Sequence, residues 1–143
     1  MKTVNIYTDG ACRGNPGVGG WGVYIEYGEA TKELYGGDEL TTNNKMELTA
    51  AIKGLEALNT KCQVNIITDS KYVMDGINGW INGWKKNNWK NSQKKDVKNK
   101  DLWIQLDKLN SHHDVKWSWV KGHSGHLQNE KADQLANKGI DTL

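Results

Sequence analysis

Four acidic residues occupy positions where the sequence predicts either the end of a strand or the inward face of a helix. Asp9 and Asp69 each follow a strand-like run that ends in Thr-Asp, whereas Glu47 and Asp133 fall within helical patterns. Any one of them alone is better explained as a helix cap, a turn residue or a surface charge. Together they predict a site at which divalent cations offset the repulsion between carboxylates, and their hard oxygen ligands suit Mg²⁺ or Mn²⁺ better than zinc. A pair of such ions about 3.5–4 Å apart can clamp a phosphodiester for in-line displacement.

The two strand-end acids share a local pattern. Residues 6–9 read Ile-Tyr-Thr-Asp and residues 66–69 read Ile-Ile-Thr-Asp. The first strand is expected to end at Gly10, which leaves Asp9 accessible to solvent on a rigid element. If the two strands are parallel neighbours and helices leave them on opposite faces, a crevice opens at their carboxyl edge, where α/β sheets bind ligands. Asp9 and Asp69 would then line that crevice.

The other two acids are predicted to point inward from helices. Threonines and asparagines at residues 41–44 are typical of a helix start, and on the helix that follows, Glu47 lies on a face of small residues that ends in Leu58. A buried acid is unfavourable without a partner, so Lys45, another cation or a metal ion should reach Glu47. Asp133 lies on the inward stripe of a later helical pattern, which runs from residue 128 to residue 138.

The segments between the acids predict a mixed α/β fold. Residues 21–27 and 32–35 are β-rich and separated by a glycine, so with the first strand they form an antiparallel meander. Residues 17–22 formally match the GxGxxG dinucleotide motif, but that motif must open a helix, and these glycines are assigned to turns instead. Residues 101–109 predict an amphipathic helix, and residues 115–120 predict a further strand.

Residues 80–100 form a basic segment on an otherwise acidic chain. The segment holds seven lysines and one acid, a net charge of +6, whereas the other residues carry 12 basic and 16 acidic groups. A solvated surface loop explains most lysine runs. Here, however, Trp80, Trp84 and Trp89 are interleaved at near-helical spacing. Lysines for phosphates together with flat rings for sugars and bases favour a nucleic-acid partner.

Composition limits the remaining possibilities. With 143 residues, 36% of them hydrophobic and 25% charged, the chain fits one domain over residues 1–143. No apolar run approaches the roughly 18 residues of a membrane span, and no signal-like segment follows Met1, so no membrane association and a cytoplasmic location are expected. Cys12 and Cys62 lack CxxC spacing and are expected to be reduced thiols, with a single disulfide as the alternative.

Several motifs, taken in chain order, resemble the ribonuclease H family and in particular bacterial ribonuclease HI. They are Thr8-Asp9-Gly10, Thr42-Asn43-Asn44-Lys45-Met46-Glu47-Leu48, Thr68-Asp69-Ser70 and Trp119-Val120-Lys121-Gly122-His123-Ser124-Gly125-His126, followed by Asn129-Glu130 and Asp133. Each motif alone is short and weakly specific. Their combination at the spacing of the family is highly specific, and the resemblance covers nearly the whole chain.

The resemblance implies a five-stranded mixed sheet in the order 3-2-1-4-5 with helices on both faces, and endonucleolytic cleavage of the RNA strand of RNA/DNA hybrids. The products would carry 5′-phosphate and 3′-hydroxyl ends. By similarity, Asp9, Glu47, Asp69 and Asp133 bind two Mg²⁺ ions, one helping to activate the attacking water and the other stabilising the leaving 3′ oxygen. His123 resembles the proton-handling histidine of the family. The remaining histidines are expected to be structural: His112, His113 and His126.

The resemblance also assigns substrate contacts, and the 2′-hydroxyl is the group by which a protein distinguishes RNA from DNA. The positions that line the RNA strand match Cys12, Asn15, Asn43 and Asn44. A pocket for a phosphate of the DNA strand matches Thr42 and Asn99, and a basic protrusion at about 80–100 with a DNA channel matches Trp80, Trp84, Lys85, Lys86 and Trp103. The chain departs from the family at Lys71, where a glutamine is common, and at Asn87-Asn88, which dilute the charge of the protrusion. Both departures put the affinity for hybrids in question. By likeness, the protein acts as a monomer.

Three other protein classes share part of this pattern. An aspartic protease uses two acids on similar loops, but its motif is Asp-Thr/Ser-Gly, whereas a threonine precedes Asp9 and Asp69 here. An integrase-like or transposase-like nuclease shares the fold and the acids but gives no reason for the asparagines at the RNA-lining positions. A hybrid-binding module without catalysis would keep the lysines and tryptophans and would not need four acids.

Overall fold

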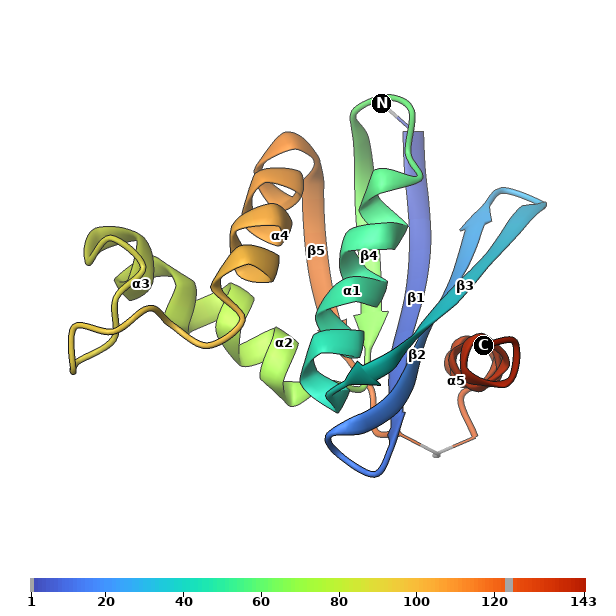
Figure 1. The fold of residues 1–143 in the computed structure, drawn as a ribbon. Helices are drawn as coiled ribbons and strands as arrows, with labels where there is room; N and C mark the ends of the chain where they lie inside the picture. The colour runs from blue at the N-terminus through green and yellow to red at the C-terminus, as the bar shows by residue number, and fades with distance from the viewer. Residues whose placement is uncertain (1, 123–124) are drawn as a thin grey trace.

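The computed structural model describes residues 2–122 and 125–143, and its centre is a five-stranded sheet in the order β3-β2-β1-β4-β5 (Figure 1). The strands are β1 (Lys2–Arg13), β2 (Gly17–Tyr27), β3 (Ala30–Thr41), β4 (Cys62–Thr68) and β5 (Asp114–Trp119). The helices are α1 (Asn43–Glu56), α2 (Lys71–Asp75), the π-helical turn η1 (Gly76–Trp80), α3 (Ile81–Lys86), α4 (Lys100–His112) and α5 (Leu127–Asp141). The strand order and the mixed α/β class implied by the sequence are confirmed.

The sheet combines an antiparallel meander with a parallel half. β1 pairs antiparallel with β2, and β2 with β3, through a tight turn at Gly28, whose φ of 59° only glycine adopts easily. β4 pairs parallel with both β1 and β5. In the β1/β4 ladder Ile6 lies opposite Ile66 and Thr8 opposite Thr68, so the two strands are parallel neighbours and their Thr-Asp segments are in register. This meets the condition under which the sequence predicted that Asp9 and Asp69 share one edge of the sheet.

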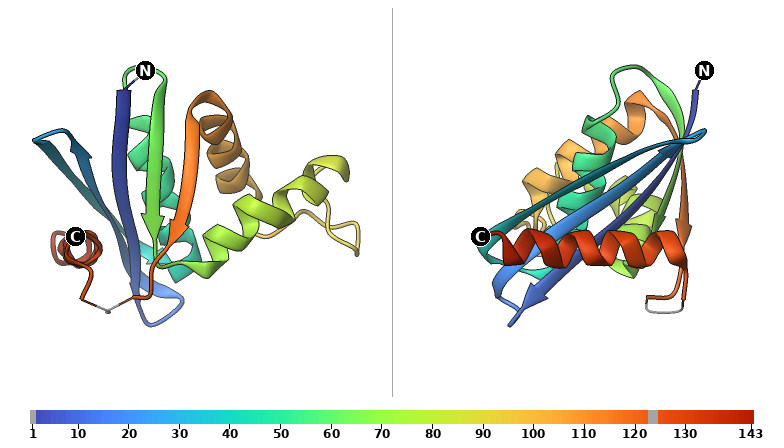
Figure 2. Two further views of the ribbon diagram at one scale, coloured as in Figure 1. Left: turned by 180° about the vertical axis from the view of Figure 1, so that it is seen from behind. Right: turned by 90° about the vertical axis from the view of Figure 1, so that its right-hand side faces the viewer.

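Helices cover the two faces of the sheet unequally. Because side chains alternate along a strand, Ile6 packs into the main core beneath α1 and α4, while the neighbouring Tyr7 packs on the other face against α5. The main core includes the fully buried Val23, Leu48 and Ile66. Figure 2 shows α5 crossing the meander side of the sheet, opposite α1 and α4. None of the helices in the described ranges is long and apolar enough to cross a membrane.

The glycines of residues 17–22 have a different role from the predicted one. They lie inside β2 rather than in turns. A Cβ atom on Gly20 would lie 2.1 Å from the carbonyl oxygen of Ala136, and one on Gly22 would lie 2.3 Å from that of Ala132. Both contacts are far too short, so glycine at these positions allows α5 to lie directly on β2. The prediction that these glycines form turns was therefore wrong, and they position the helix that carries Asp133.

β1 also extends beyond the predicted end at Gly10. It continues to Arg13 because residues 9–13 remain paired with β2, with Asp9 opposite Gly22 and Arg13 opposite Val18. The parallel pairing with β4 nevertheless stops at Thr8, so Asp9 does lie at the carboxyl edge of the parallel half. β1 leads into β2 and not into a helix, so the predicted crevice between two departing helices is replaced by one between α1, α2 and α5.

The basic segment, residues 80–100, projects from the body and is called the basic protrusion below. It contains α3 and the following loop, which extends away from the sheet (Figure 1). The helical segment that leads into it bends through η1, where Gly76 packs against the Trp103 ring: a Cβ atom there would lie 2.1 Å from the ring. Within the loop, Lys90 and Asp96 form an isolated antiparallel bridge, and buried Val97 anchors its return to α4.

Candidate active site

Three carboxylates from separate elements converge at the carboxyl edge of β1 and β4. One oxygen each from Asp9, Glu47 and Asp69 can be chosen such that all lie within 4.8 Å of one another. Asp9 and Glu47 are buried, with 4% and 5% of their surface exposed, and Asp69 is half-buried. They line a depression of about 540 Å³, here called the carboxylate pocket, together with Asp133 of α5.

The start of α1 brings Glu47 to this position. The Thr42 hydroxyl caps the helix by accepting a hydrogen bond from the Lys45 backbone N–H at 3.2 Å, which confirms the predicted helix start. The helix lies so close to β1 that a Cβ atom on Gly10 would be 2.5 Å from the Glu47 backbone nitrogen. Lys45 is exposed and forms no ion pair with Glu47 within the described residues. Lys45 is therefore not the partner that a buried Glu47 needs.

The electrostatics of the pocket favour a cation. Burial raises the pKa of Asp9 far above its ordinary value, and the neighbouring Glu47 and Asp69 raise it further. Burial, followed by repulsion from Asp69, likewise raises the pKa of Glu47. The Glu47 Oε1 atom is buried without a hydrogen-bond partner. A close set of oxygen ligands with one unsatisfied buried atom fits a hard divalent cation, which would remove both the repulsion and the unpaired acceptor.

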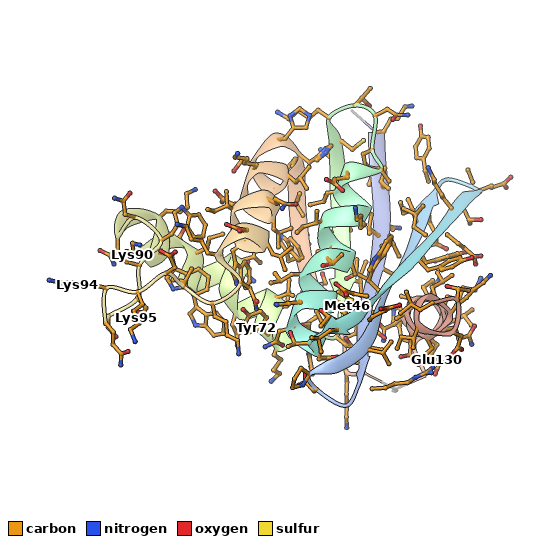
Figure 3. All side chains as sticks on the ribbon, viewed as in Figure 1. Met46, Tyr72, Lys90, Lys94, Lys95 and Glu130 are labelled. Atoms are coloured by element: carbon orange, nitrogen blue, oxygen red, sulfur yellow. The ribbon has the colours of Figure 1, made fainter. Side chains whose placement is uncertain are left out.

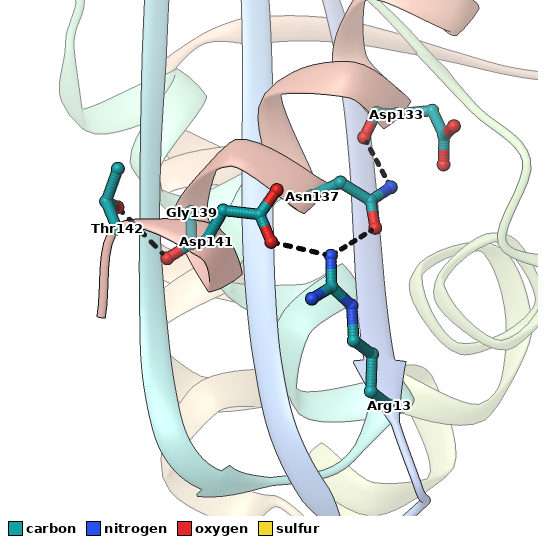
Figure 4. A network of polar contacts seen from close by, with 6 residues as sticks. All are labelled: Arg13, Asp133, Asn137, Gly139, Asp141 and Thr142. Atoms are coloured by element: carbon teal, nitrogen blue, oxygen red, sulfur yellow. Dashed lines mark hydrogen bonds and ion pairs between the residues drawn. The ribbon is translucent and has the colours of Figure 1, made fainter.

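Asp133 joins the pocket from the other side of the sheet but not the tight group of three. It lines the pocket and shares a hydrogen bond with Asp9 that raises the pKa of Asp9. Its helix is tied to the end of β1: Asn137 donates to the Asp133 carbonyl at 3.0 Å, while Arg13 donates to Asn137 at 3.4 Å and pairs with Asp141 at 2.9 Å (Figure 4). The structure therefore places Asp133 as a peripheral member of the acidic set.

Residues predicted to face RNA lie next to the carboxylates. Cys12, Asn43 and Asn44 all line the carboxylate pocket. Asn15 reaches the same region from the turn after β1, because its side-chain oxygen accepts a hydrogen bond from the Asn43 backbone N–H at 3.0 Å. Cys12 is an unbridged, half-buried thiol, and Cys62 is an unbridged buried one, as predicted. One face of the pocket is thus formed by backbone and amide groups suited to a polar ligand.

The resemblance places Thr42 and Asn99 in one phosphate pocket. In the structure the two side chains make different contacts. The Thr42 hydroxyl is engaged in capping α1. Asn99 lines a different depression of about 470 Å³, together with Lys45 and Lys100. Its amide nitrogen donates to the Tyr72 hydroxyl at 3.1 Å, and its backbone is left-handed with a φ of 60°.

The tryptophans of the protrusion pack with the start of α4 in tilted and edge-to-face ring contacts. The ring centroids of Trp80 and Trp84 are 6.0 Å apart, and those of Trp84 and Trp103 are 5.4 Å apart. Trp80 is 44% exposed, whereas Trp103 is completely buried and its indole N–H donates to the Tyr72 hydroxyl at 3.1 Å. The assignment of Trp103 as a substrate contact is therefore wrong, because a residue without exposed surface cannot touch a nucleic acid. It is a core residue that supports the exposed rings.

Six of the seven lysines of the protrusion are exposed and Lys100 is half-buried, and several of them are paired with acids. Lys85 contacts Asp107 at 3.2 Å, and Asp96 pairs with both Lys90 and, at 3.5 Å, Lys100. The hydrogen bond from Lys90 is the main reason that the pKa of Asp96 is lowered. Lys90, Lys94 and Lys95 extend from the protrusion, far from α1 and α5 (Figure 3). A groove of about 800 Å³ runs between Trp80, Trp84, Lys90 and Lys94.

His123 lies outside the described residues, but the residue before it is close to the pocket. A Cβ atom on Gly122 would lie 2.7 Å from an Asp69 carboxylate oxygen. On the other side, the His126 side chain caps α5 by accepting from the Asn129 backbone N–H at 3.2 Å. His113, buried, accepts from the Cys62 N–H at 3.1 Å. His113 and His126 therefore have the structural roles expected of them.

Sequence reasoning missed several residues of the pocket wall. Ser70, Lys71 and Tyr72 all line it, and the Trp119 indole N–H donates to the Asp69 carbonyl oxygen at 2.9 Å. The first three could have been found, because they form the first turn of a helix that begins where β4 ends, at the edge that carries the acids. The role of Trp119 cannot be predicted from local sequence, because it depends on the pairing of β5 with β4.

Comparison with known proteins agrees with this geometry. The sequence pattern of the RNase H family matches residues 1–141. The chain is 63% identical to a ribonuclease H of Alcanivorax borkumensis over 100% of this chain and 95% of that protein, and 59% identical to a ribonuclease HI of Neisseria meningitidis serogroup B over 96% and 95%. Its fold is similar to the crystal structure of a type 1 RNase H with the type 2 active-site motif, with a TM-score of 0.91, 32% identity and coverage of 99% of this chain and 74% of that one. The chain therefore belongs to the RNase H family.

Proposed function

We propose that the carboxylate pocket hydrolyses the RNA strand of RNA/DNA hybrids endonucleolytically and releases 5′-phosphate and 3′-hydroxyl ends. The observation that carries this proposal is the meeting of two sets of groups in one depression. Carboxylate oxygens of three acids lie within 4.8 Å of one another, and these acids line the same pocket as Cys12, Asn43 and Asn44. The first set suits phosphodiester hydrolysis, and the second offers polar groups for a 2′-hydroxyl.

Asp9, Glu47, Asp69 and Asp133 would hold two Mg²⁺ ions, for which Mn²⁺ could substitute. When bound, such ions supply an activated water and stabilise the leaving 3′ oxygen. The carboxylates themselves act as ligands that fix the reacting groups in place, and no side chain needs to serve as the nucleophile. Burial raises the pKa of both Asp9 and Glu47, and a bound cation favours their ionised forms, so binding of the ions should release protons.

Substrate recognition is proposed to divide between the pocket and the protrusion. Cys12, Asn15, Asn43 and Asn44 would follow the cleaved RNA strand. The DNA strand would cross the protrusion and the Asn99 depression, in contact with Thr42, Trp80, Trp84, Lys85, Lys86 and Asn99. His123 would transfer a proton at the reacting phosphate. We expect the protein to act as a cytoplasmic monomer.

Three other functions explain less of the site. A binding module without catalysis gives no reason for burying Asp9 and Glu47 side by side, which is unfavourable in the absence of a cation. A related nuclease for duplex DNA would need the acids but not the polar groups at Cys12, Asn43 and Asn44. A protease of the aspartic type would use two acids, whereas three converge here.

One assay separates these functions. Strand-labelled RNA/DNA hybrid, duplex RNA and duplex DNA are each incubated with the protein in Mg²⁺ or in EDTA. The proposal predicts cleavage of the RNA strand of the hybrid alone, and only with Mg²⁺. Cleavage of duplex DNA would favour the integrase-like alternative, and binding of the hybrid without cleavage would favour the binding module.

A further inference from the structure

We propose that Lys71 is an additional substrate-binding residue of this chain, whose ammonium group holds a phosphate of the cleaved strand beside the carboxylates. The inference rests on the proposed function, since it assumes that a nucleic-acid strand enters the carboxylate pocket. It also reverses the expectation from sequence, in which a lysine at this position put the affinity for hybrids in question.

The position of Lys71 is fixed relative to the acids. It is the first residue of α2, two residues after Asp69, and it lines the carboxylate pocket. Its ammonium nitrogen lies 4.9 Å from the centroid of the Trp119 ring, a cation–π distance. The same indole donates its N–H to the Asp69 carbonyl oxygen at 2.9 Å. Lys71 and Asp69 are therefore linked through one aromatic side chain at the rim of the pocket.

The acids of the pocket do not neutralise the charge of Lys71 through ion pairs. Within the described residues Lys71 forms no ion pair with Asp9, Glu47 or Asp69. Its side chain is exposed, and the Trp119 ring beneath it is 42% exposed. The ammonium group is thus held at the mouth of an acidic pocket with donors still available. An anion that enters the pocket passes it.

A phosphodiester is the anion that the chemistry of the site selects. A phosphate that approaches a cluster of carboxylates is repelled, and a positive charge at the mouth offsets part of that repulsion. An ammonium group donates up to three hydrogen bonds, and phosphate oxygens accept them strongly. Any phosphate next to the carboxylates belongs to the strand that is cut, so the contact is assigned to the RNA strand. A glutamine here could donate a hydrogen bond but would release no counterion.

The test compares the wild-type chain with Lys71→Gln, Lys71→Arg and Lys53→Gln. Lys53 is an exposed lysine on α1 that pairs with Glu56 at 3.6 Å and does not line the pocket, so its substitution removes the same charge elsewhere. The dissociation constant for a fluorescein-labelled RNA/DNA hybrid of about 20 base pairs is measured by anisotropy in EDTA between about 50 and 200 mM KCl, a range over which phosphate interactions change affinity strongly. Hybrid cleavage in Mg²⁺ is measured on the same proteins.

Removing one phosphate interaction flattens the plot of log affinity against log salt by about 0.9, so the weakening of binding in Lys71→Gln should be about threefold larger at 50 mM than at 200 mM salt. Lys71→Arg should restore the wild-type slope, and Lys53→Gln should keep it. In Mg²⁺, Lys71→Gln should raise KM and leave kcat within about twofold, as expected for uniform binding. Equal slopes for wild type and Lys71→Gln would overturn the inference. Failure of the wild type to cleave hybrid would instead reject the proposed function, while the binding slopes still report on Lys71.

Discussion

The carboxylate pocket and the basic protrusion place charge in opposite ways. In the pocket, negatively charged side chains are gathered, Asp9 and Glu47 are buried, and Glu47 keeps an unsatisfied oxygen. On the protrusion, seven lysines surround a single acid, Asp96, which partly neutralises Lys90 and Lys100. Exposed pairs contribute little each, whereas a buried unpaired acid is strongly unfavourable.

The two regions therefore depend on their individual residues in different ways. The pocket depends on particular atoms in a fixed arrangement, which we propose is completed by bound metal ions. The protrusion depends on the sum of its charge and on the exposed ring of Trp80, so its single lysines should be replaceable one at a time. Substitutions in the two regions should therefore differ in size and in the quantity that they change.

The largest effect is expected from the three converging carboxylates. Asp9→Asn, Glu47→Gln and Asp69→Asn should each lower the rate of Mg²⁺-dependent hybrid cleavage by orders of magnitude, because each removes a charged metal ligand. Asp133→Asn should be milder, since an amide oxygen can still coordinate and Asp133 lies outside the group of three. Single-turnover cleavage of labelled hybrid measures this, and a wild-type rate in any of the first three would remove that residue from the site.

A smaller decrease in rate is expected at His123. His123→Ala should lower kcat by about 10²-fold, the lower end of what general acid–base catalysis contributes. The affinity for hybrid in EDTA should change little, because proton transfer is not binding. His126→Ala is the comparison, since it should act through the start of α5 and lower the melting temperature instead. A parallel decrease in affinity in His123→Ala would point to a role in binding the substrate.

Two tryptophans should separate stability from binding. Trp103→Ala should lower the free energy of unfolding by about 3–5 kcal/mol, because it empties a fully buried site. Trp80→Ala should lower stability far less and instead weaken hybrid binding by about 1–3 kcal/mol if its exposed ring stacks on a base. Urea denaturation and anisotropy titrations of both variants provide the comparison. Normal stability of Trp103→Ala would contradict its place in the core.

The smallest effect on the enzyme is expected from the protrusion. Neutralising Lys85, Lys86 and Lys90 together should flatten the salt dependence of hybrid binding by up to about 0.9 for each phosphate that is no longer bound, with little change in turnover at saturating substrate. The change should fall short of that limit, because Lys85 and Lys90 already pair with Asp107 and Asp96. Binding titrations across a range of salt measure the slope. A slope that does not change would leave these lysines as a solvated surface.

The features predicted correctly from the sequence are those that a local residue pattern determines. The repeated Ile-x-Thr-Asp segments predicted that Asp9 and Asp69 stand at equivalent strand ends, and the Thr-Asn start predicted the helix that carries Glu47. These features follow from alternation, capping and helical period, which short segments contain.

The wrong predictions concern residues whose roles depend on packing against segments that are far away in the sequence. The glycines at 20 and 22 were assigned to turns, because nothing near them shows that α5 lies against β2. Trp103 was interpreted as a substrate contact from its likeness to a residue of the family's DNA channel, but packing under α2 and α3 buries it completely. The link from Lys71 through Trp119 to Asp69 joins segments that are far apart in sequence.

The central claim, that the pocket is an unfavourable cluster of acids until a cation enters, is tested most directly by thermal melts of wild type and Asp9→Asn in EDTA and in Mg²⁺. Because the folded chain raises the pKa values of Asp9 and Glu47 above those of the unfolded chain, native protein binds more protons at neutral pH, and the stability of wild type in EDTA should fall as the pH rises from about 5 to 8. Asp9→Asn should weaken that fall and melt a few degrees higher than wild type at about pH 8 in EDTA. Added Mg²⁺ should stabilise wild type more and close the difference, because it binds the native state. A lower melting temperature for Asp9→Asn than for wild type in EDTA would show that Asp9 serves as a structural hydrogen-bond acceptor and would contradict the account.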